Sequence, residues 1–117
     1  MEIIKYNEIE VKIDYENNTI WLTQEEIANL YKIDKSGISK YIKKIRESGM
    51  LDFDRVCAKF AHEQFITNNK SKTKIRIYNL EVIKAIGYKI NSNVVNEFSN
   101  WVEGLFFKKC YFNEKRL

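Results

Sequence analysis

The first part of the chain alternates between apolar and polar residues. The alternation is strict over Glu8–Ile13, and Thr19–Leu22 follows it after a segment rich in turn-forming residues, Asp14–Asn18. Successive side chains of a strand point to opposite faces, so an alternating segment predicts a strand with one buried face. The sequence therefore predicts a β-hairpin in this region.

At Thr23 the pattern changes to a helical period. Thr23 and Glu26 have the spacing of a capping box, in which the Thr hydroxyl and the Glu carboxylate each accept a hydrogen bond from the other residue's backbone N–H. A short helix is expected to begin there and to be interrupted at residues 32–34. Its apolar face consists of Ile27, Leu30 and Tyr31.

A second helix is predicted between Asp34 and Gly49. Asp is favoured as an N-cap because its carboxylate accepts hydrogen bonds from the first backbone N–H groups, and Gly commonly ends a helix. Apolar residues recur between them at helical spacing: Ile38, Tyr41, Ile42 and Ile45. The two helices are thus joined by only about three residues.

The remaining sequence predicts two more strands and two more helices. Residues 56–65 and 72–78 are predicted to be strands on either side of a polar loop. Asn79 is expected to cap a helix over Leu80–Lys89, and a last helix is expected after Asn91-Ser92. The expected fold class is α+β, with β-hairpins before and after the first helix pair and two C-terminal helices.

Length and composition favour a single domain over residues 1–117. A chain of 117 residues that is 44% hydrophobic can bury one core. No apolar segment approaches the ~20 residues of a membrane-spanning helix, and no signal peptide is recognisable. Cys57, Cys110 and the lone His62 do not supply the clustered ligands of a structural zinc site. We expect a cytoplasmic protein without a cofactor.

The net charge of +4 is distributed unevenly. Residues 1–22 are acidic overall, whereas residues 35–46 hold five basic residues and no acid, and residues 70–90 hold six basic residues against Glu81 alone. We call residues 35–46 and 70–90 the two basic segments. Such asymmetry is typical of a surface that binds nucleic acid. The alternative interpretation is that each basic segment is simply a solvated face.

Two short helices, the second of them basic, form the arrangement of a helix-turn-helix. Ala28 is the small residue that lets such helices approach each other. Lys32 occupies the position where the motif usually has Gly at positive φ, so we expect strain of roughly 1 kcal/mol or a different turn. The alternative is an ordinary αα-hairpin with a lysine-rich face.

In a helix-turn-helix, the second helix would lie in the major groove of DNA. The residues expected to face the groove are Lys35, Ser36, Gly37, Ser39, Lys40 and Lys43. Ser hydroxyls can bond base edges, and Lys can bind phosphate or guanine. Gly37 would let the backbone pass close to a base or phosphate. Lys44 and Arg46, later in the helix, are expected to hold the DNA backbone.

The second predicted hairpin adds another basic surface. Its loop and second strand carry, on one face, Lys70, Lys72, Lys74 and Arg76. A winged helix places such a hairpin against an adjacent groove or the DNA backbone. The alternative is an exposed edge strand that its lysines keep soluble.

Several segments together resemble the N-terminal part of the RhuM family of bacterial virulence-associated proteins, which occur with mobile elements and prophages. They are WLTQEEIANLYKIDKSGISKYIKKIRESG, VCAKFAHE, IYNLEVIKAIGYKINS and NEKRL. The resemblance implies a DNA-binding domain related to those of phage antirepressors, and a role in transcription regulation. This chain differs at Val94-Val95, where the family has a basic residue and a glycine. Family members continue past NEKRL, so the resemblance implies a fragment or a natural truncation.

Two other functions compete with DNA binding. Asp52 and Asp54 are spaced to hold Mg²⁺ in a nuclease, but such a pair more commonly caps a helix or lies in a surface loop, and His62 lacks a partner acid or nucleophile. We therefore expect no enzyme. The second is a protein-interaction module, antirepressor-like or homo-oligomeric, that uses the aromatic residues near the C-terminus: Trp101, Phe106, Phe107, Tyr111 and Phe112. The adjacent Phe106 and Phe107 cannot both face one core.

Overall fold

The computed structural model describes residues 1–62 and 73–115, with the side chains of residues 1–58 and 75–107. Within these ranges the chain forms one antiparallel sheet and five helices, which confirms the expected α+β class. No helix of the described part is long and apolar enough to cross a membrane.

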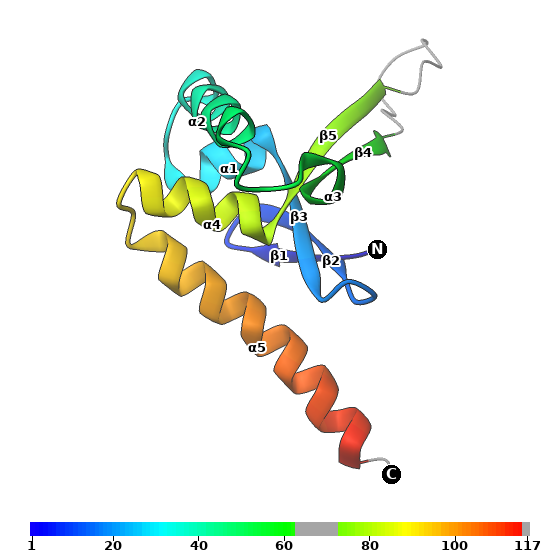
Figure 1. Ribbon diagram of the computed structural model, residues 1–117. Coiled ribbons are helices and arrows are strands. Elements are labelled where there is room, and N and C mark those ends of the chain that lie inside the picture. The colour runs from blue at the N-terminus through cyan, green and yellow to red at the C-terminus, as the bar shows by residue number, and fades with distance from the viewer. Residues whose placement is uncertain (63–72, 116–117) are drawn as a thin grey trace.

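Three strands precede the helices and two lie among them (Figure 1). The strands are β1 (Glu2–Tyr6), β2 (Ile9–Asp14), β3 (Thr19–Thr23), β4 (Cys57–His62) and β5 (Thr73–Asn79). The helices are α1 (Gln24–Tyr31), α2 (Lys35–Ser48), α3 (Phe53–Val56), α4 (Leu80–Lys89) and α5 (Val94–Lys115). The sheet has the order β1-β2-β3-β5-β4, so β5 lies between β3 and β4.

Both predicted hairpins are confirmed. In β2–β3, Ile13 lies opposite Ile20, and in β4–β5, Ala58 lies opposite Ile77. Strand β1 was not predicted, because its sequence EIIKY does not alternate; it is held by pairing with β2 at the edge of the sheet.

The short helix α3 was also missed. Asp52 caps it, with Oδ1 accepting a hydrogen bond from the N–H of Asp54 at 3.0 Å. The chain is therefore still helical at Val56, where we predicted the strand to begin, and β4 starts one residue later. A helix of four residues is too short to show a period in the sequence.

The capping box at the start of α1 is present in both directions. The N–H of Glu26 donates to Thr23 Oγ1 at 3.1 Å, and the N–H of Thr23 donates to Glu26 Oε1 at 2.7 Å. The same Oε1 is 2.8 Å from Nζ of Lys12, in an ion pair whose side chains are only 9% and 17% exposed. One carboxylate thus caps α1 and fastens it to β2.

The turn between α1 and α2 has the positive φ expected at Lys32. Lys32 has φ 55° and ψ 46°, and its N–H donates to the carbonyl of Ala28. Helix α2 follows Asp34, as predicted, although the Asp34 side chain makes no capping hydrogen bond. Gly49, with φ 71°, ends α2.

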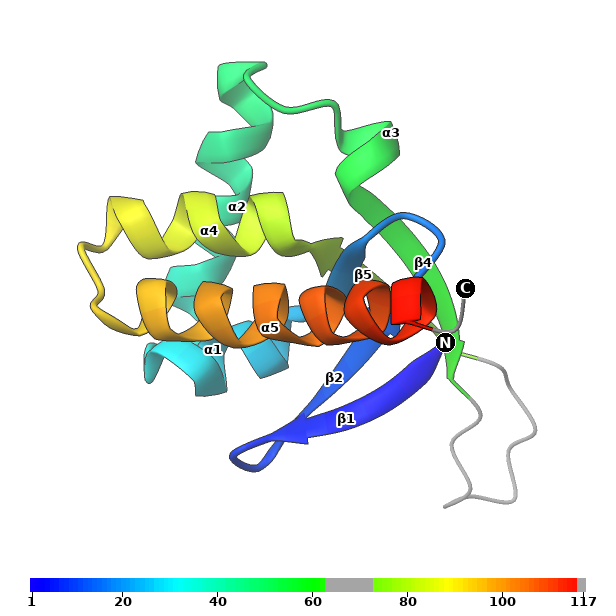
Figure 2. The same cartoon turned by 90° about the horizontal axis from the view of Figure 1, so that it is seen from below.

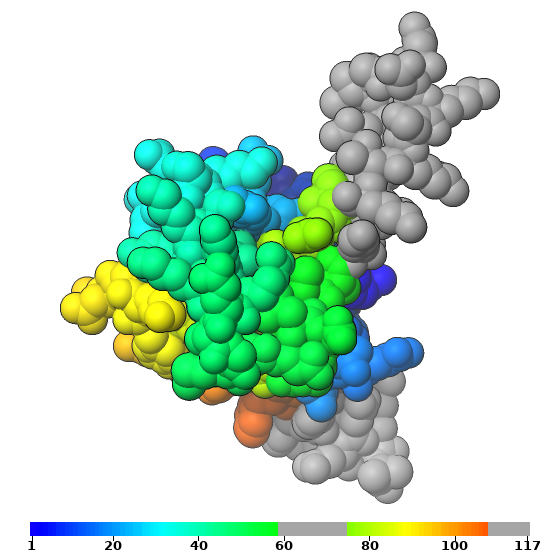
Figure 3. All heavy atoms as spheres, turned by 45° about the horizontal axis from the view of Figure 1, so that its top comes forward, coloured from blue at the N-terminus to red at the C-terminus, as the bar shows by residue number. Residues whose placement is uncertain are grey.

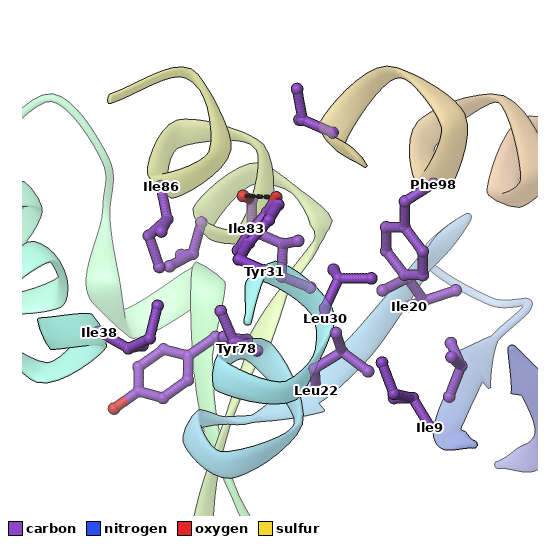
Figure 4. Packing of buried hydrophobic residues seen from close by; sticks show 14 of the residues in the cluster. Ile9, Ile20, Leu22, Leu30, Tyr31, Ile38, Tyr78, Ile83, Ile86 and Phe98 are labelled. Carbon is purple, nitrogen blue, oxygen red and sulfur yellow. Dashed lines mark hydrogen bonds between the residues drawn. The ribbon is translucent and has the colours of Figure 1, made fainter. Parts of the chain in front are cut away.

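The core lies between one face of the sheet and the helices α1, α2, α4 and α5 (Figure 4). Helices α4 and α5 lie side by side and run in roughly opposite directions (Figure 2). The Tyr31 hydroxyl donates to the carbonyl of Ile83 at 2.6 Å. Burial, with a smaller effect of Tyr88, raises the pKa of Tyr31 well above its ordinary value, so the hydroxyl stays a donor.

Gly87 allows three helices to meet. A Cβ atom at this position would lie 2.6 Å from the Tyr31 hydroxyl of α1 and 2.7 Å from Cβ of Val95 on α5. Both distances are shorter than side-chain contacts allow, so any larger residue would push these helices apart.

Near the C-terminal end of the described side chains, two adjacent aromatic residues face different ways. The Phe106 ring packs edge-on against Tyr15, with centroids 5.9 Å apart, whereas Phe107 is 71% exposed. The prediction that these two residues cannot share one core is confirmed.

The turn residue Lys32 gives the first testable prediction. Lys32→Gly should raise the free energy of unfolding by about 0.5–1 kcal/mol, because glycine adopts positive φ without strain. Urea denaturation measures this change. Lys40→Gly, in the exposed middle of α2, is the control and should destabilise by about 1 kcal/mol. Loss of stability in both variants would contradict the strain at Lys32.

The close approach at Gly87 gives the second. Gly87→Ala should destabilise by about 1–3 kcal/mol because of the steric overlap, measured by urea denaturation. Gly104→Ala is the matched control, since a Cβ there has nothing within 4 Å, and it should be neutral or stabilising. In the Tyr31→Phe background, whose own cost includes the lost hydrogen bond to Ile83, Gly87→Ala should destabilise less than in the wild type, because the oxygen nearest to the new methyl group is gone. An equal cost of Gly87→Ala in both backgrounds would show that Val95 alone makes the clash.

Candidate nucleic-acid interface

A groove of about 870 Å³ runs between α2, the start of α1 and β5. Figure 3 shows side chains of α2 and of β5 on the same face of the molecule. The groove is lined by Thr23, Gln24, Glu25, Lys35, Ser36, Ser39, Lys40, Ile42, Lys43, Arg46, Glu47, Ile75, Arg76 and Tyr78.

Five of the six residues expected to face the major groove line this groove: Lys35, Ser36, Ser39, Lys40 and Lys43. All five are exposed, and they recur at helical spacing along one side of α2. The opposite side of the helix is buried through Ile38, Ile42 and Ile45. The structure therefore brings these five side chains together, and their contact with DNA stays a prediction.

Two other predicted residues of α2 lie on a different side of the helix. A Cβ atom at Gly37 would lie 3.0 Å from Cγ2 of Ile33, so Gly37 faces the turn rather than the groove. The ammonium group of Lys44 lies 5.9 Å from the ring centroid of Tyr41. The expected outward orientation of Gly37 was wrong, because a side chain at this position would point toward Ile33. The close approach of Ile33 explains why the residue is a glycine. Lys44, which we expected to hold the DNA backbone, lies beside the groove.

The second basic segment is described only in part. Lys70 and Lys72 lie outside the described residues. Lys74 lies in β5 opposite Ala61, and its side chain lies outside the described part. Arg76, two residues further along β5, lines the groove.

The groove carries an excess of positive charge. Its basic side chains are Lys35, Lys40, Lys43, Arg46 and Arg76, and its acidic side chains are Glu25 and Glu47. The ion pairs found among the described residues join Lys12 to Glu26 and Arg55 to Glu81, and none involves a groove residue. None of the five basic side chains of the groove is therefore held in an ion pair within that part of the chain, and they outnumber the two acidic ones.

Gln24 and Tyr78 belong to the site, although sequence reasoning missed both. The Gln24 amide donates to the carbonyl of Lys35 at 2.9 Å and so joins the start of α1 to the start of α2. The Tyr78 ring lies beside Ile38, and its hydroxyl points away from the core (Figure 4). Tyr78 lines the groove because β5 pairs with β3, and the local sequence contains no signal for that pairing.

Burial raises the pKa of the Tyr78 hydroxyl, and the Cys57 thiol opposite it raises this pKa further. Arg76 and Arg46 act in the opposite direction without reversing the shift. The hydroxyl therefore stays protonated at neutral pH and can donate a hydrogen bond.

The Mg²⁺ hypothesis for Asp52 and Asp54 finds no support in the geometry. Asp52 serves as the N-cap of α3, which is the alternative that its sequence context favoured. Nowhere in the described ranges do three or more His, Cys, Asp or Glu residues gather as a metal site would require.

Comparisons of the chain with protein-family models, with curated proteins and with solved structures found no match. The resemblance to the RhuM family therefore stays a prediction from the sequence.

Proposed function

We propose that the protein binds duplex DNA through the groove beside α2 and acts as a transcriptional regulator. The observation that carries this proposal is the gathering of five basic side chains, from α2 and β5, that have no carboxylate partner in the described part of the chain. A row of phosphates is a ligand that would neutralise several such charges at once.

The order of elements supports a winged-helix-like mode of binding. The chain runs β3–α1–α2–β4–β5, apart from the single turn of α3, and β5 lies between β3 and β4 in the sheet. In a winged helix with this order, α2 is the recognition helix in the major groove and the β4–β5 hairpin is the wing. The wing would carry Lys70, Lys72 and Lys74 toward the DNA backbone.

The groove residues have different parts in this proposal. Ser36 and Ser39 would bond base edges, because a hydroxyl both donates and accepts. Lys40 and Lys43 would bind phosphate or the O6 and N7 atoms of guanine. The side chain of the N-cap Asp34 makes no hydrogen bond to the first N–H groups of α2, so these groups would be available to donate to a phosphate, against the negative charge of Asp34.

The resemblance to the RhuM family supports a bacterial or prophage-derived regulator that works in the cytoplasm. A second candidate is a protein-interaction or oligomerisation module, which the exposure of Phe107 on α5 favours. Titration with DNA separates the two candidates.

Binding should depend steeply on salt. In fluorescence anisotropy with random-sequence duplex DNA, the chain should bind at micromolar or weaker affinity. The logarithm of the binding constant should fall by about 0.9 per neutralised phosphate for each unit of log salt concentration. Binding that is independent of salt, or no binding at about 50 mM salt, would contradict DNA binding and favour the protein-interaction module.

Lys40 and Lys44 carry the same charge on neighbouring sides of α2, so they form a matched pair of variants. On a site selected in vitro, Lys40→Ala should cost about 1–3 kcal/mol of binding free energy, because this residue lines the groove. Lys44→Ala should change affinity by less than about half as much. Anisotropy titrations measure both, with thermal melting as the folding control. Equal losses in the two variants would show that charge alone, and not the groove, determines binding.

A further inference from the structure

Arg46 is held in place by an aromatic ring. It lies in the last turn of α2, and its guanidinium carbon is 4.9 Å from the ring centroid of Phe53. Phe53 is the first residue of α3, and its half-buried ring packs against the core. Stacking on an aromatic ring fixes a guanidinium without neutralising its charge. Arg46 therefore keeps both its orientation and its full positive charge.

Arg46 and Arg76 share a second surface beside the groove. A cavity of about 370 Å³ adjoins the groove and is lined by Arg46, Phe53, Asp54, Cys57, Ala58 and Arg76. Both arginines line the cavity and the groove, so they mark the boundary between the two. They come from α2 and β5, elements that only the folded sheet brings together.

The charges of these two arginines are not balanced by the nearby carboxylates. Asp54 lines the same cavity and Glu47 the groove, but neither forms an ion pair among the described residues. Arg55, in the same short helix as Phe53, is different: its guanidinium lies 2.6 Å from Glu81. Arg76 interacts with the Tyr78 hydroxyl, which leaves its charge unneutralised. Two guanidinium groups that line one cavity without an ion-pair partner in the described part of the chain favour an anion between them. The geometry of a guanidinium matches phosphate, which it binds through two parallel hydrogen bonds.

We propose that Arg46 and Arg76 together bind one phosphate of the DNA backbone at the edge of the groove, and that Phe53 is the positioning residue that holds Arg46 for this contact. The proposal rests on the proposed function and deepens it by assigning a phosphate contact to residues outside the row Ser36, Ser39, Lys40 and Lys43. A phosphate held from both α2 and β5 fixes how the recognition helix is aligned along the DNA, because phosphate contacts position a protein.

The test uses fluorescence anisotropy with one duplex at several salt concentrations. Arg46→Ala and Arg76→Ala should each lower affinity about tenfold at low salt. Because both contact one phosphate, the double variant should reduce the salt slope by about 0.9 rather than by twice that amount. Arg55→Ala is the control, since it removes an arginine from the neighbouring position that is paired with Glu81, and it should leave affinity unchanged within about twofold.

Phe53 is tested through its dependence on Arg46. Phe53→Leu should lower affinity about three- to fivefold, whereas Phe53→Tyr, which keeps an aromatic ring, should restore it. In the Arg46→Ala background, Phe53→Leu should have no further effect, because the guanidinium that it positions is gone. A residue that is only structural would lower affinity equally in both backgrounds. Thermal melting shows whether each variant is folded at the temperature of the binding assay. If Phe53→Leu is unfolded at that temperature, Phe53→Met replaces it.

The outcomes separate this inference from the proposed function. If the wild-type chain binds with a steep salt dependence and the variants Arg46→Ala and Arg76→Ala bind as tightly as Arg55→Ala, the shared phosphate contact is wrong and DNA binding stands. If the double variant loses about two units of slope, the arginines contact different phosphates and the shared site is wrong. If the wild-type chain shows no salt-dependent binding, both proposals fail.

Discussion

The groove depends on the pairing of β3 with β5. These strands are far apart in the sequence, and α1, α2, α3 and β4 all lie between them. Because Leu22 lies opposite Tyr78 in this pair, the end of the first hairpin and the second hairpin belong to one sheet. Helix α2 belongs to the segment between these two strands, and the β3–β5 hydrogen bonds hold the two ends of that segment together. The polar side of α2 faces β5. Without this pairing, Arg46 and Arg76 would not line the same groove.

Polar contacts then determine how the helix pair sits on the sheet. The Glu26 carboxylate receives hydrogen bonds from both Thr23 and Lys12, which ties the start of α1 to two strands. Both side chains of this ion pair are largely buried, so removing either partner would leave the other charge poorly solvated and unpaired. The Gln24 amide donates a hydrogen bond to the carbonyl of Lys35, the first residue of α2, and so fixes the start of α2 relative to α1. The position of α2 beside the groove is therefore set at the start of α1, where Thr23 and Gln24 themselves line the groove.

Local signals predicted most of the fold, and contacts between distant residues explain what the sequence could not predict. The capping box, the turn at Lys32 and the end of α2 at Gly49 were predicted because each depends on a few neighbouring residues. The groove side of α2 followed from helical spacing. Tyr78 could not be predicted as a site residue, because strand pairing alone brings it to the groove. Gly37 was misplaced for a similar reason: the contact with Ile33 depends on the shape of the turn.

One side of α2 packs in the core, and the other side lines the groove. Ile38, Ile42 and Ile45 hold the helix in the core, while the side chains along the groove have no ion-pair partner within the described part of the chain. Substitutions along the groove side would leave the packing of the helix intact. If the groove binds DNA as proposed, its preference for one DNA sequence can therefore change during evolution without loss of folding. Under the proposed function, a few exposed positions on α2 would determine which operator is bound, while the buried isoleucines stay the same.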